Sequence, residues 1–216
     1  MILSMDKETI ASRIYAHRGF WNSKSERNTL KAFESASYNG FSVETDFREH
    51  KGRVVISHDL VEENHHPMQL DDYLNLGIKT AINIKSDGLS GIFDKSRDLI
   101  EAAESWVFDG SIPEMLIYKK LGIKHALRIS EVEQELPWAA PVLWFDCFFS
   151  DWYVNRIDLI EKFSNCEIVL VSPEIHSIDF RRAWDYFKNL ISIGFLNVSL
   201  CTDYPDKIIG EINNEV

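Results

Sequence analysis

The chain has 216 residues, and we expect residues 1–216 to form a single domain. Hydrophobic residues make up 45% of it and aromatic residues 12%, which is enough for a core without disulfides and excludes general disorder. The 34 acidic residues outnumber the 23 basic ones and give a formal net charge of −11. Because no cluster of Lys and Arg overrides this charge, we expect no nucleic-acid binding.

Cysteine usage and the N-terminal residues indicate a reduced compartment. Cys147, Cys166 and Cys201 are odd in number and form neither a Cys-x-x-Cys pair nor a zinc pattern. Charged residues at positions 6–8 interrupt the start before a signal peptide could form, and no apolar run approaches the roughly 20 residues of a membrane helix. We therefore expect a cytoplasmic protein without a membrane span. The sequence carries no signal for the oligomeric state.

Short runs rich in β-branched and aromatic residues alternate with stretches of helical spacing. The expected strands are Arg13–His17, Phe41–Phe47, Arg53–Ser57, Thr80–Lys85, Trp106–Phe108, His125–Ile129, Val142–Phe145, Ile168–Val171 and Leu196–Cys201. The expected helices are Thr29–Tyr38, capped by Asn28, then Leu70–Leu76, Ser90–Glu104, Pro113–Leu121, Trp152–Lys162 and Asp179–Ile191.

This alternation predicts an α/β protein with a (β/α)8 TIM barrel, trimmed relative to the typical length of about 250 residues. Nine strands are one too many for eight, and either Arg53–Ser57 or Val142–Phe145 is the extra one. Residues 48–52 are too few for a crossover helix, so we expect a hairpin or an irregular return between the second and third strands.

The carboxyl ends of parallel strands share one face, and polar residues gather at the expected ends. They are His17, Arg18, Glu44, Asp46, His58, Asp59, Asn83, Lys85, Asp109, Arg128, Asp146, Glu174, His176 and Asp203. Glu44 and Asp46 point to the same side of a strand, where two carboxylates can bind a hard cation. Taken alone, such a pair is more often a salt-bridged one, and a lone histidine is more often structural. Together these residue types suggest a phosphate, a divalent cation and an acid/base pair in one pocket.

Several segments resemble the motifs of the glycerophosphodiester phosphodiesterase family. The opening matches are Ala16-His17-Arg18-Gly19 and Asn28-Thr29-Leu30-x-Ala32-Phe33. Val43-Glu44-Thr45-Asp46 resembles the family's Glu-x-Asp metal strand, and Val54-Val55-Ile56-Ser57-His58-Asp59 its His-Asp strand. Asn83-Ile84-Lys85 resembles its Glu-x-Lys strand, and Cys201-Thr202-Asp203-Tyr204-Pro205-Asp206 its closing Thr-Asp-x-Pro. These segments span residues 16–206, nearly the whole chain.

The resemblance implies hydrolysis of a glycerol-type or sugar-linked phosphodiester with one bound Mg²⁺ or Ca²⁺. His17 is expected as the base and His58 as the acid, roles that suit imidazole because its ordinary pKa is about 6.5. In the family the attacker is usually the neighbouring glycerol hydroxyl, which gives a cyclic phosphate. Arg18 and Lys85 would bind the phosphate, and the cation would be held by Glu44, Asp46 and Asn83. The other histidines, His50, His65, His66 and His125, are expected to be structural or superficial.

Two residues depart from the family pattern. Arg27 stands where the family has a glutamate, and Asn83 stands where it has a third carboxylate for the metal. An amide oxygen can bind Mg²⁺ or Ca²⁺ but brings no charge, so the candidates for an additional ligand are Asp109, Asp146 and Glu174. The family's small inserted domain is expected to be absent or vestigial, since only residues 60–79 lie between the third and the fourth expected strands. Two alternatives remain: a decayed phosphate-binding barrel, and a lyase of the same scaffold that releases a cyclic phosphate.

Overall fold

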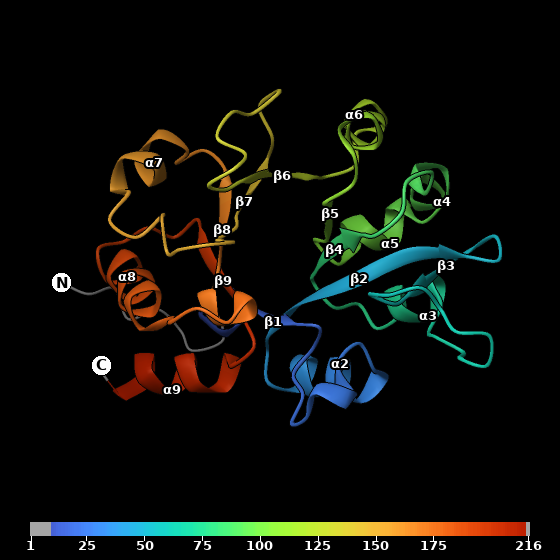
Figure 1. Ribbon diagram of the computed structural model, residues 1–216, viewed down its shortest axis with the longest axis horizontal. Coiled ribbons are helices and arrows are strands. Elements are labelled where there is room, and N and C mark those ends of the chain that lie inside the picture. The colour runs from blue at the N-terminus through green and yellow to red at the C-terminus, as the bar shows by residue number, and fades with distance from the viewer. Residues whose placement is uncertain (1–9, 215–216) are drawn as a thin grey trace.

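Parallel strands form a nearly closed barrel in the computed structural model, which describes residues 10–214 (Figure 1). The strands are β1 (Ile14–His17), β2 (Ser42–His50), β3 (Arg53–Ile56), β4 (Thr80–Ile84), β5 (Trp106–Phe108), β6 (Ala126–Ile129), β7 (Val142–Phe145), β8 (Glu167–Val171) and β9 (Val198–Thr202). Around the barrel their order is β5-β4-β2-β1-β9-β8-β7-β6. A parallel bridge from Val107 to His125 joins the two outer strands, so the expected eight-stranded TIM barrel is confirmed.

Aromatic side chains fill the inside of the barrel. Tyr15 of β1 packs edge-on against Trp106 of β5, with ring centroids 5.8 Å apart. Trp144 of β7 lies 5.9 Å from Trp106 and 4.4 Å from Phe108, again between ring centroids. All four side chains are buried. Because these contacts join strands from different parts of the wall, the interior is a packed core, and the chemistry has to lie at an open end of the barrel.

The extra ninth strand is β3, which pairs antiparallel with β2 and lies outside the barrel path. Lys51 (φ 51°) and Gly52 (φ 79°) make the two-residue turn between them, which requires positive φ at both positions. The prediction of a hairpin is thus confirmed, whereas the doubt about Val142–Phe145 was wrong, because that run is β7 of the barrel wall. Figure 1 shows the hairpin projecting beyond the barrel.

Helices cover the outside of the barrel. They are α2 (Leu30–Tyr38), α3 (Leu70–Leu74), α4 (Ser90–Lys95), α5 (Arg97–Ala102), α6 (Ile112–Leu121), α7 (Ile157–Lys162), α8 (Arg181–Ser192) and α9 (Pro205–Asn214), with short 3-10 turns η1 (Lys24–Glu26) and η2 (Pro173–His176). The expected helix over residues 90–104 is two helices that meet at Ser96. The helix expected from Trp152 begins at Ile157, because Asn155 adopts a left-handed conformation (φ 66°). Within residues 10–214, no helix is long and apolar enough to cross a membrane.

The loop after β1 is pressed against the start of α2. Thr29, not the expected Asn28, caps this helix by accepting a hydrogen bond from the Ala32 backbone N–H. A Cβ on Gly19 would lie 2.8 Å from the Ala32 Cβ, so only glycine allows this close approach. Arg18 is fixed there too, because its backbone N–H donates to the Glu44 carbonyl at 2.7 Å. The loop therefore holds Arg18 and Asn28 at the carboxyl ends of β1 and β2.

Candidate active site

The register of three neighbouring strands brings four of the predicted site residues together. His17 of β1 lies beside Glu44 of β2, and Asp46 of β2 lies beside Asn83 of β4. None of the four is more than 8% exposed. Two carboxylates, an imidazole and an amide are thus buried side by side at the carboxyl ends of parallel strands, which is where ligands bind in barrels of this kind.

Asp46 is surrounded by positive charge. Its Oδ2 lies 3.1 Å from Arg18 Nε, and its Oδ1 lies 3.3 Å from Lys85 Nζ. The Asn28 side-chain amide donates to Oδ2 at 2.9 Å, with its orientation set by Thr45, whose hydroxyl donates to Asn28 Oδ1. Burial by itself would raise the pKa of Asp46, but the two cations and the amide outweigh it and hold the pKa below its ordinary value. Asp46 is therefore an anion at neutral pH.

Glu44 has the opposite balance. Burial raises the pKa of its carboxyl group, and the charge of Asp46 adds to the effect. The Asn83 side-chain amide N–H donates to Glu44 Oε1 at 3.0 Å, and its carbonyl oxygen, Oδ1, accepts no hydrogen bond. A positive charge placed near Glu44 would therefore favour its ionised form.

Three buried oxygens of this cluster have no hydrogen-bond partner: Glu44 Oε2, Asp46 Oδ1 and Asn83 Oδ1. Asp46 Oδ1 has the ion pair with Lys85 at 3.3 Å, and Glu44 Oε2 lies 3.8 Å from His17 Nε2. Buried oxygens without a hydrogen bond are costly, and carboxylate and amide oxygens are the ligands that Mg²⁺ and Ca²⁺ prefer. The residues present therefore fit a divalent cation. Among the residues described, no three His, Cys, Asp or Glu side chains are arranged to hold a metal, so a cation here needs the Asn83 amide oxygen.

His17 is held from behind by Asp203, the residue that follows β9. Its Nδ1 lies 2.7 Å from Asp203 Oδ1, and its Nε2 lies 3.8 Å from Glu44 Oε2. The second oxygen of Asp203 accepts a hydrogen bond from Arg27 Nη2 at 2.6 Å. Sequence reasoning placed Asp203 at a strand end but gave it no partner, because residues 17 and 203 lie at opposite ends of the chain.

His58 lies at the rim of the site. Its side chain is 41% exposed, and Nδ1 lies 3.0 Å from Oδ1 of the superficial Asp59. The hairpin explains how it reaches the barrel mouth: β2 runs on past the barrel, and β3 returns until the Ser57 backbone N–H donates to the Asp46 carbonyl at 3.0 Å. A positive charge on His58 contributes to lowering the pKa of Asp46.

The candidate additional metal ligands make other contacts. Arg128 Nη1 lies 3.1 Å from Asp109 Oδ1 and 3.8 Å from Asp146 Oδ2. Asp146 Oδ1 lies 2.8 Å from His176 Nε2. Burial raises the pKa of Asp109, although Arg128 opposes this. These residues form a second cluster, on β5 to β8 and the turns that follow, around Arg128.

Glu174 is tied to the strand end that carries Asp203. It accepts hydrogen bonds from the Ser172 and Thr202 hydroxyls and, at 3.1 Å, from the Asp203 backbone N–H. Burial raises its pKa despite these bonds. Its two carboxylate oxygens are thus engaged in fixing the backbone behind His17.

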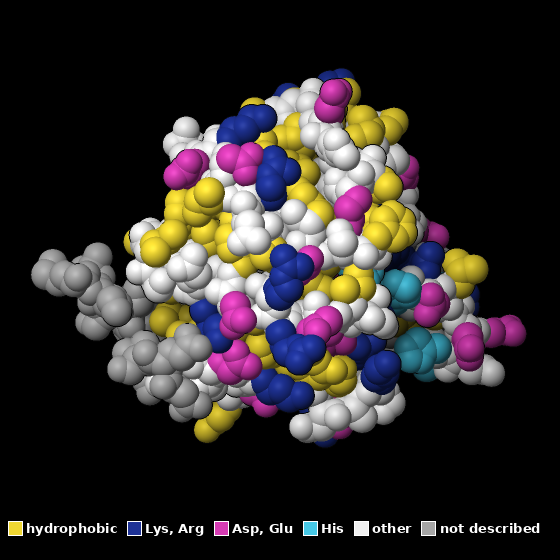
Figure 2. Space-filling view, turned by 60° about the vertical axis from the view of Figure 1, so that its left-hand side comes forward, with side chains coloured by type: hydrophobic (Ala, Val, Ile, Leu, Met, Phe, Trp, Pro, Cys, Tyr) yellow, Lys and Arg dark blue, Asp and Glu magenta, His cyan; other side chains and the backbone are white. Residues whose placement is uncertain are grey.

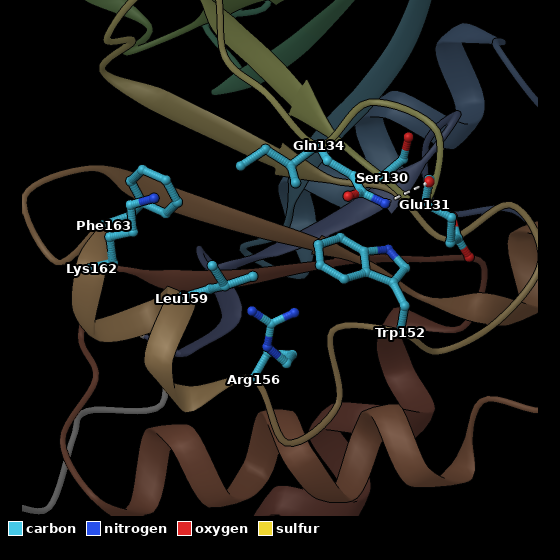
Figure 3. A pocket seen from close by; sticks show the side chains of 9 residues that line it. Ser130, Glu131, Gln134, Trp152, Arg156, Leu159, Lys162 and Phe163 are labelled. Carbon is cyan, nitrogen blue, oxygen red and sulfur yellow. Dashed lines mark hydrogen bonds between the residues drawn. The ribbon is translucent and has the colours of Figure 1, made fainter.

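The outer surface of the described residues offers a face of mixed charge and a cavity beside α7 for comparison with the barrel mouth. In Figure 2, Lys and Arg side chains are interspersed with Asp and Glu over the face in view and form no broad basic patch. A cavity of about 380 Å³ lies between the loop after β6 and α7 (Figure 3). There Trp152 and Arg156 face Gln134, whose side-chain amide donates to the Glu131 carbonyl. None of the predicted site residues lines this cavity.

Comparison with known proteins gives a consistent result for the fold. No protein-family model and no curated protein matches the sequence. The chain is similar to the crystal structure of a glycerophosphodiester phosphodiesterase from Agrobacterium tumefaciens, with a TM-score of 0.65, 18% identity, and coverage of 91% of this chain and 98% of that one. It is also similar to a candidate glycerophosphodiester phosphodiesterase from Galdieria sulphuraria, with a TM-score of 0.63, 17% identity, and coverage of 93% and 97%. The barrel is therefore the one found in these structures.

Proposed function

We propose that the protein is a divalent-cation-dependent phosphodiesterase that acts on a glycerol-type or sugar-linked phosphodiester. One observation carries the proposal: three buried oxygens without a hydrogen-bond partner lie beside an imidazole and two cationic side chains at the carboxyl ends of β1, β2 and β4. Support also comes from the barrel, which is the fold of proteins described as glycerophosphodiester phosphodiesterases. The three cysteines are unpaired, which fits a cytoplasmic enzyme.

His17 would act as the base. With Nδ1–H donating to Asp203, the lone pair of Nε2 faces the site and can take the proton of the attacking hydroxyl group. The new P–O bond forms as that proton moves to Nε2. His58, at the rim, would return a proton to the oxygen of the breaking P–O bond, so that the alcohol leaves uncharged.

The remaining groups would balance charge. Arg18 and Lys85 would bind the phosphoryl oxygens on which negative charge builds. Glu44, Asp46 and Asn83 would hold the cation, either Mg²⁺ or Ca²⁺, which when bound supplies Lewis-acid polarisation of a phosphoryl oxygen. Asp109, Asp146 and Glu174 would then shape the rest of the barrel mouth.

The test is turnover of glycerophosphocholine and bis-(p-nitrophenyl) phosphate by protein treated with EDTA and then resupplied with Mg²⁺ or Ca²⁺. We expect activity that EDTA abolishes and the metal restores. Phosphorus NMR of the products separates a hydrolase from a lyase, since a lyase leaves the cyclic phosphate as the end product. Binding of glycerol 3-phosphate without turnover of either substrate would refute the enzyme and favour the decayed barrel.

The control variant for contaminating phosphodiesterase is Glu44→Gln/Asp46→Asn, purified in the same way. It lacks both charged ligands of the cation and keeps the size of each side chain. Activity that persists in this variant at the wild-type level would show that the measured turnover comes from another site or another protein.

A further inference from the structure

We propose that Arg27 is a positioning residue for His17, acting through the carboxylate of Asp203; the catalytic part of this inference rests on the proposed function. Arg27 lies in the loop between β1 and α2, outside the strands of the barrel. The hydrogen bond, ion pair and ring contact of its side chain are made with Asp203 and Trp21.

A single carboxylate joins Arg27 to His17. Asp203 Oδ1 lies 2.7 Å from His17 Nδ1, and Asp203 Oδ2 lies 2.6 Å from Arg27 Nη2. Oδ2 of Asp203 therefore accepts a charge-assisted hydrogen bond from the guanidinium, and Oδ1 is paired with the imidazole. The side chains of His17 and Asp203 are each 10% exposed and that of Arg27 20%, so water competes weakly for these bonds.

Arg27 is itself held in place from the His17 side. Its guanidinium carbon lies 4.4 Å from the centroid of the Trp21 ring, a cation–π distance. The Trp21 indole N–H donates to the His17 backbone carbonyl at 2.9 Å. The contacts thus form a closed circuit through Trp21, Arg27, Asp203 and His17. Trp21 holds the backbone of His17, Asp203 holds its ring, and Arg27 contacts both Trp21 and Asp203.

This circuit matters because a neutral imidazole has two tautomers, and only the one with the proton on Nδ1 leaves Nε2 free to accept a proton. A carboxylate bonded only to the histidine can rotate about its own side-chain torsion and take the ring with it. Arg27 fixes the second carboxylate oxygen, which removes this rotation. Removing the guanidinium would therefore loosen the ring and mix its tautomers without changing the groups that bind phosphate.

The geometry argues against a direct role of Arg27 in substrate binding. Arg27 Nη2 is committed to Asp203, and the guanidinium lies over the Trp21 ring, so these two contacts of Arg27 tie it to the supports of His17. By contrast, Arg18 and Lys85 lie against Asp46 at the cation cluster. A positioning residue is expected to affect kcat, whereas a phosphate-binding residue is expected to affect KM.

The kinetic test compares Arg27→Gln, Arg27→Lys and Asp203→Asn with the double variant Arg27→Gln/Asp203→Asn. We expect Arg27→Gln to lower kcat at least about tenfold, the scale found for groups that orient a functional histidine, and to leave KM within about twofold. Arg27→Lys should restore most of the loss. The double variant should be no slower than Asp203→Asn, because Arg27 acts only through that carboxylate.

The control variant is Arg156→Gln. It also removes an arginine paired with an aspartate, Asp158, but near α7 and outside the barrel mouth. Its kcat and KM should equal those of the wild type. A rise in KM with unchanged kcat in Arg27→Gln would overturn the proposal and assign Arg27 to substrate binding. Additive losses in the double variant, or no rescue by lysine in a protein with a wild-type melting temperature, would overturn it as well.

A second readout does not depend on activity. Long-range ¹H–¹⁵N correlation of the imidazole ring of His17, well above the ordinary pKa of imidazole, should show the Nδ1–H tautomer in the wild type and a mixture in Arg27→Gln. An unchanged tautomer in Arg27→Gln would overturn the inference even if the enzyme is active. If the tautomer shifts as expected and no phosphodiester is cleaved, the proposed function fails and the positioning contact stands.

Discussion

Asn83 provides the sharpest test of the cation cluster. Its side-chain amide donates to Glu44 Oε1 at 3.0 Å, and its carbonyl oxygen is one of the three buried oxygens without a hydrogen-bond partner. Asn83→Glu replaces the donor by a carboxylate. In metal-free protein the change removes a hydrogen bond to a charged group, a loss of about 1.5–3 kcal/mol. It also places a third negative charge beside Glu44 and Asp46.

The size of the effect follows from these contacts. Two charges about 4 Å apart repel by about 4 kcal/mol at an effective dielectric constant of about 20, and uptake of a proton by Glu44, whose pKa burial already raises, relieves part of this. A net destabilisation of at least about 2 kcal/mol lowers Tm by about 4–8 °C for a chain of this size. With a divalent cation bound, the added charge becomes favourable, since charge count tunes the affinity of oxygen sites.

The assay is thermal unfolding in EDTA and in saturating Mg²⁺ or Ca²⁺. Asn83→Gln is the matched control because glutamine has the size of glutamate and no charge. We expect Asn83→Glu to melt below Asn83→Gln in EDTA and to gain more from the metal, with tighter binding in calorimetry. Equal melting temperatures in EDTA together with equal gains from the metal would refute the cluster as a cation site.

Replacing either His17 or His58 by Ala should lower kcat/KM at least about 100-fold, the usual scale for a general acid or base, in assays of p-nitrophenol release. Near-wild-type activity would remove that residue from the mechanism. The double change Glu44→Gln/Asp46→Asn should abolish the Mg²⁺ and Ca²⁺ binding seen in calorimetry, and undiminished heat would place the cation elsewhere. Burial alone would raise the pKa of Glu131, but hydrogen bonds from backbone N–H groups outweigh burial and lower it. The ionised Glu131 therefore stabilises the folded protein above the ordinary pKa of glutamate, and this contribution is lost as the pH falls through the lowered pKa of the folded state. Glu131→Gln should therefore lower Tm near neutral pH by a margin that shrinks in acid, whereas a constant margin would contradict the ionised role.

The part of the site that could be predicted from the sequence is the part that strand geometry determines. Glu44 and Asp46 are two residues apart, and period-two alternation places both on one side of β2 in any register. His17 and Asn83 follow because neighbouring parallel strands end at the same edge. The barrel itself was predictable since the apolar runs alternate with helical stretches along the chain.

What could not be predicted depends on loops and on contacts distant in sequence. The hairpin before β3 was expected, but its length was not: His58 reaches the barrel mouth because β2 extends past the barrel and the antiparallel β3 returns to it. The partnership of Arg27 with Asp203 joins residues 176 positions apart. The late start of α7 depends on the left-handed Asn155, a conformation that the helical spacing of that stretch does not reveal.

Arg27 and Asn83, the two residues that depart from the family motifs, both change the net charge of the pocket. The three carboxylates Glu44, Asp46 and Asp203 face three cations, Arg18, Lys85 and Arg27, so the formal charges cancel before His17 is counted. A glutamate in place of Arg27 or of Asn83 would make the pocket negative and attract a cation by charge alone. Under the proposed function, the attraction comes instead from the oxygens of Glu44, Asp46 and Asn83 that lack a hydrogen bond, and the negative phosphodiester supplies the charge that the pocket lacks. By linkage, the cation and the substrate then strengthen each other's binding by the same factor, so Asn83 does not by itself favour a decayed barrel over an enzyme.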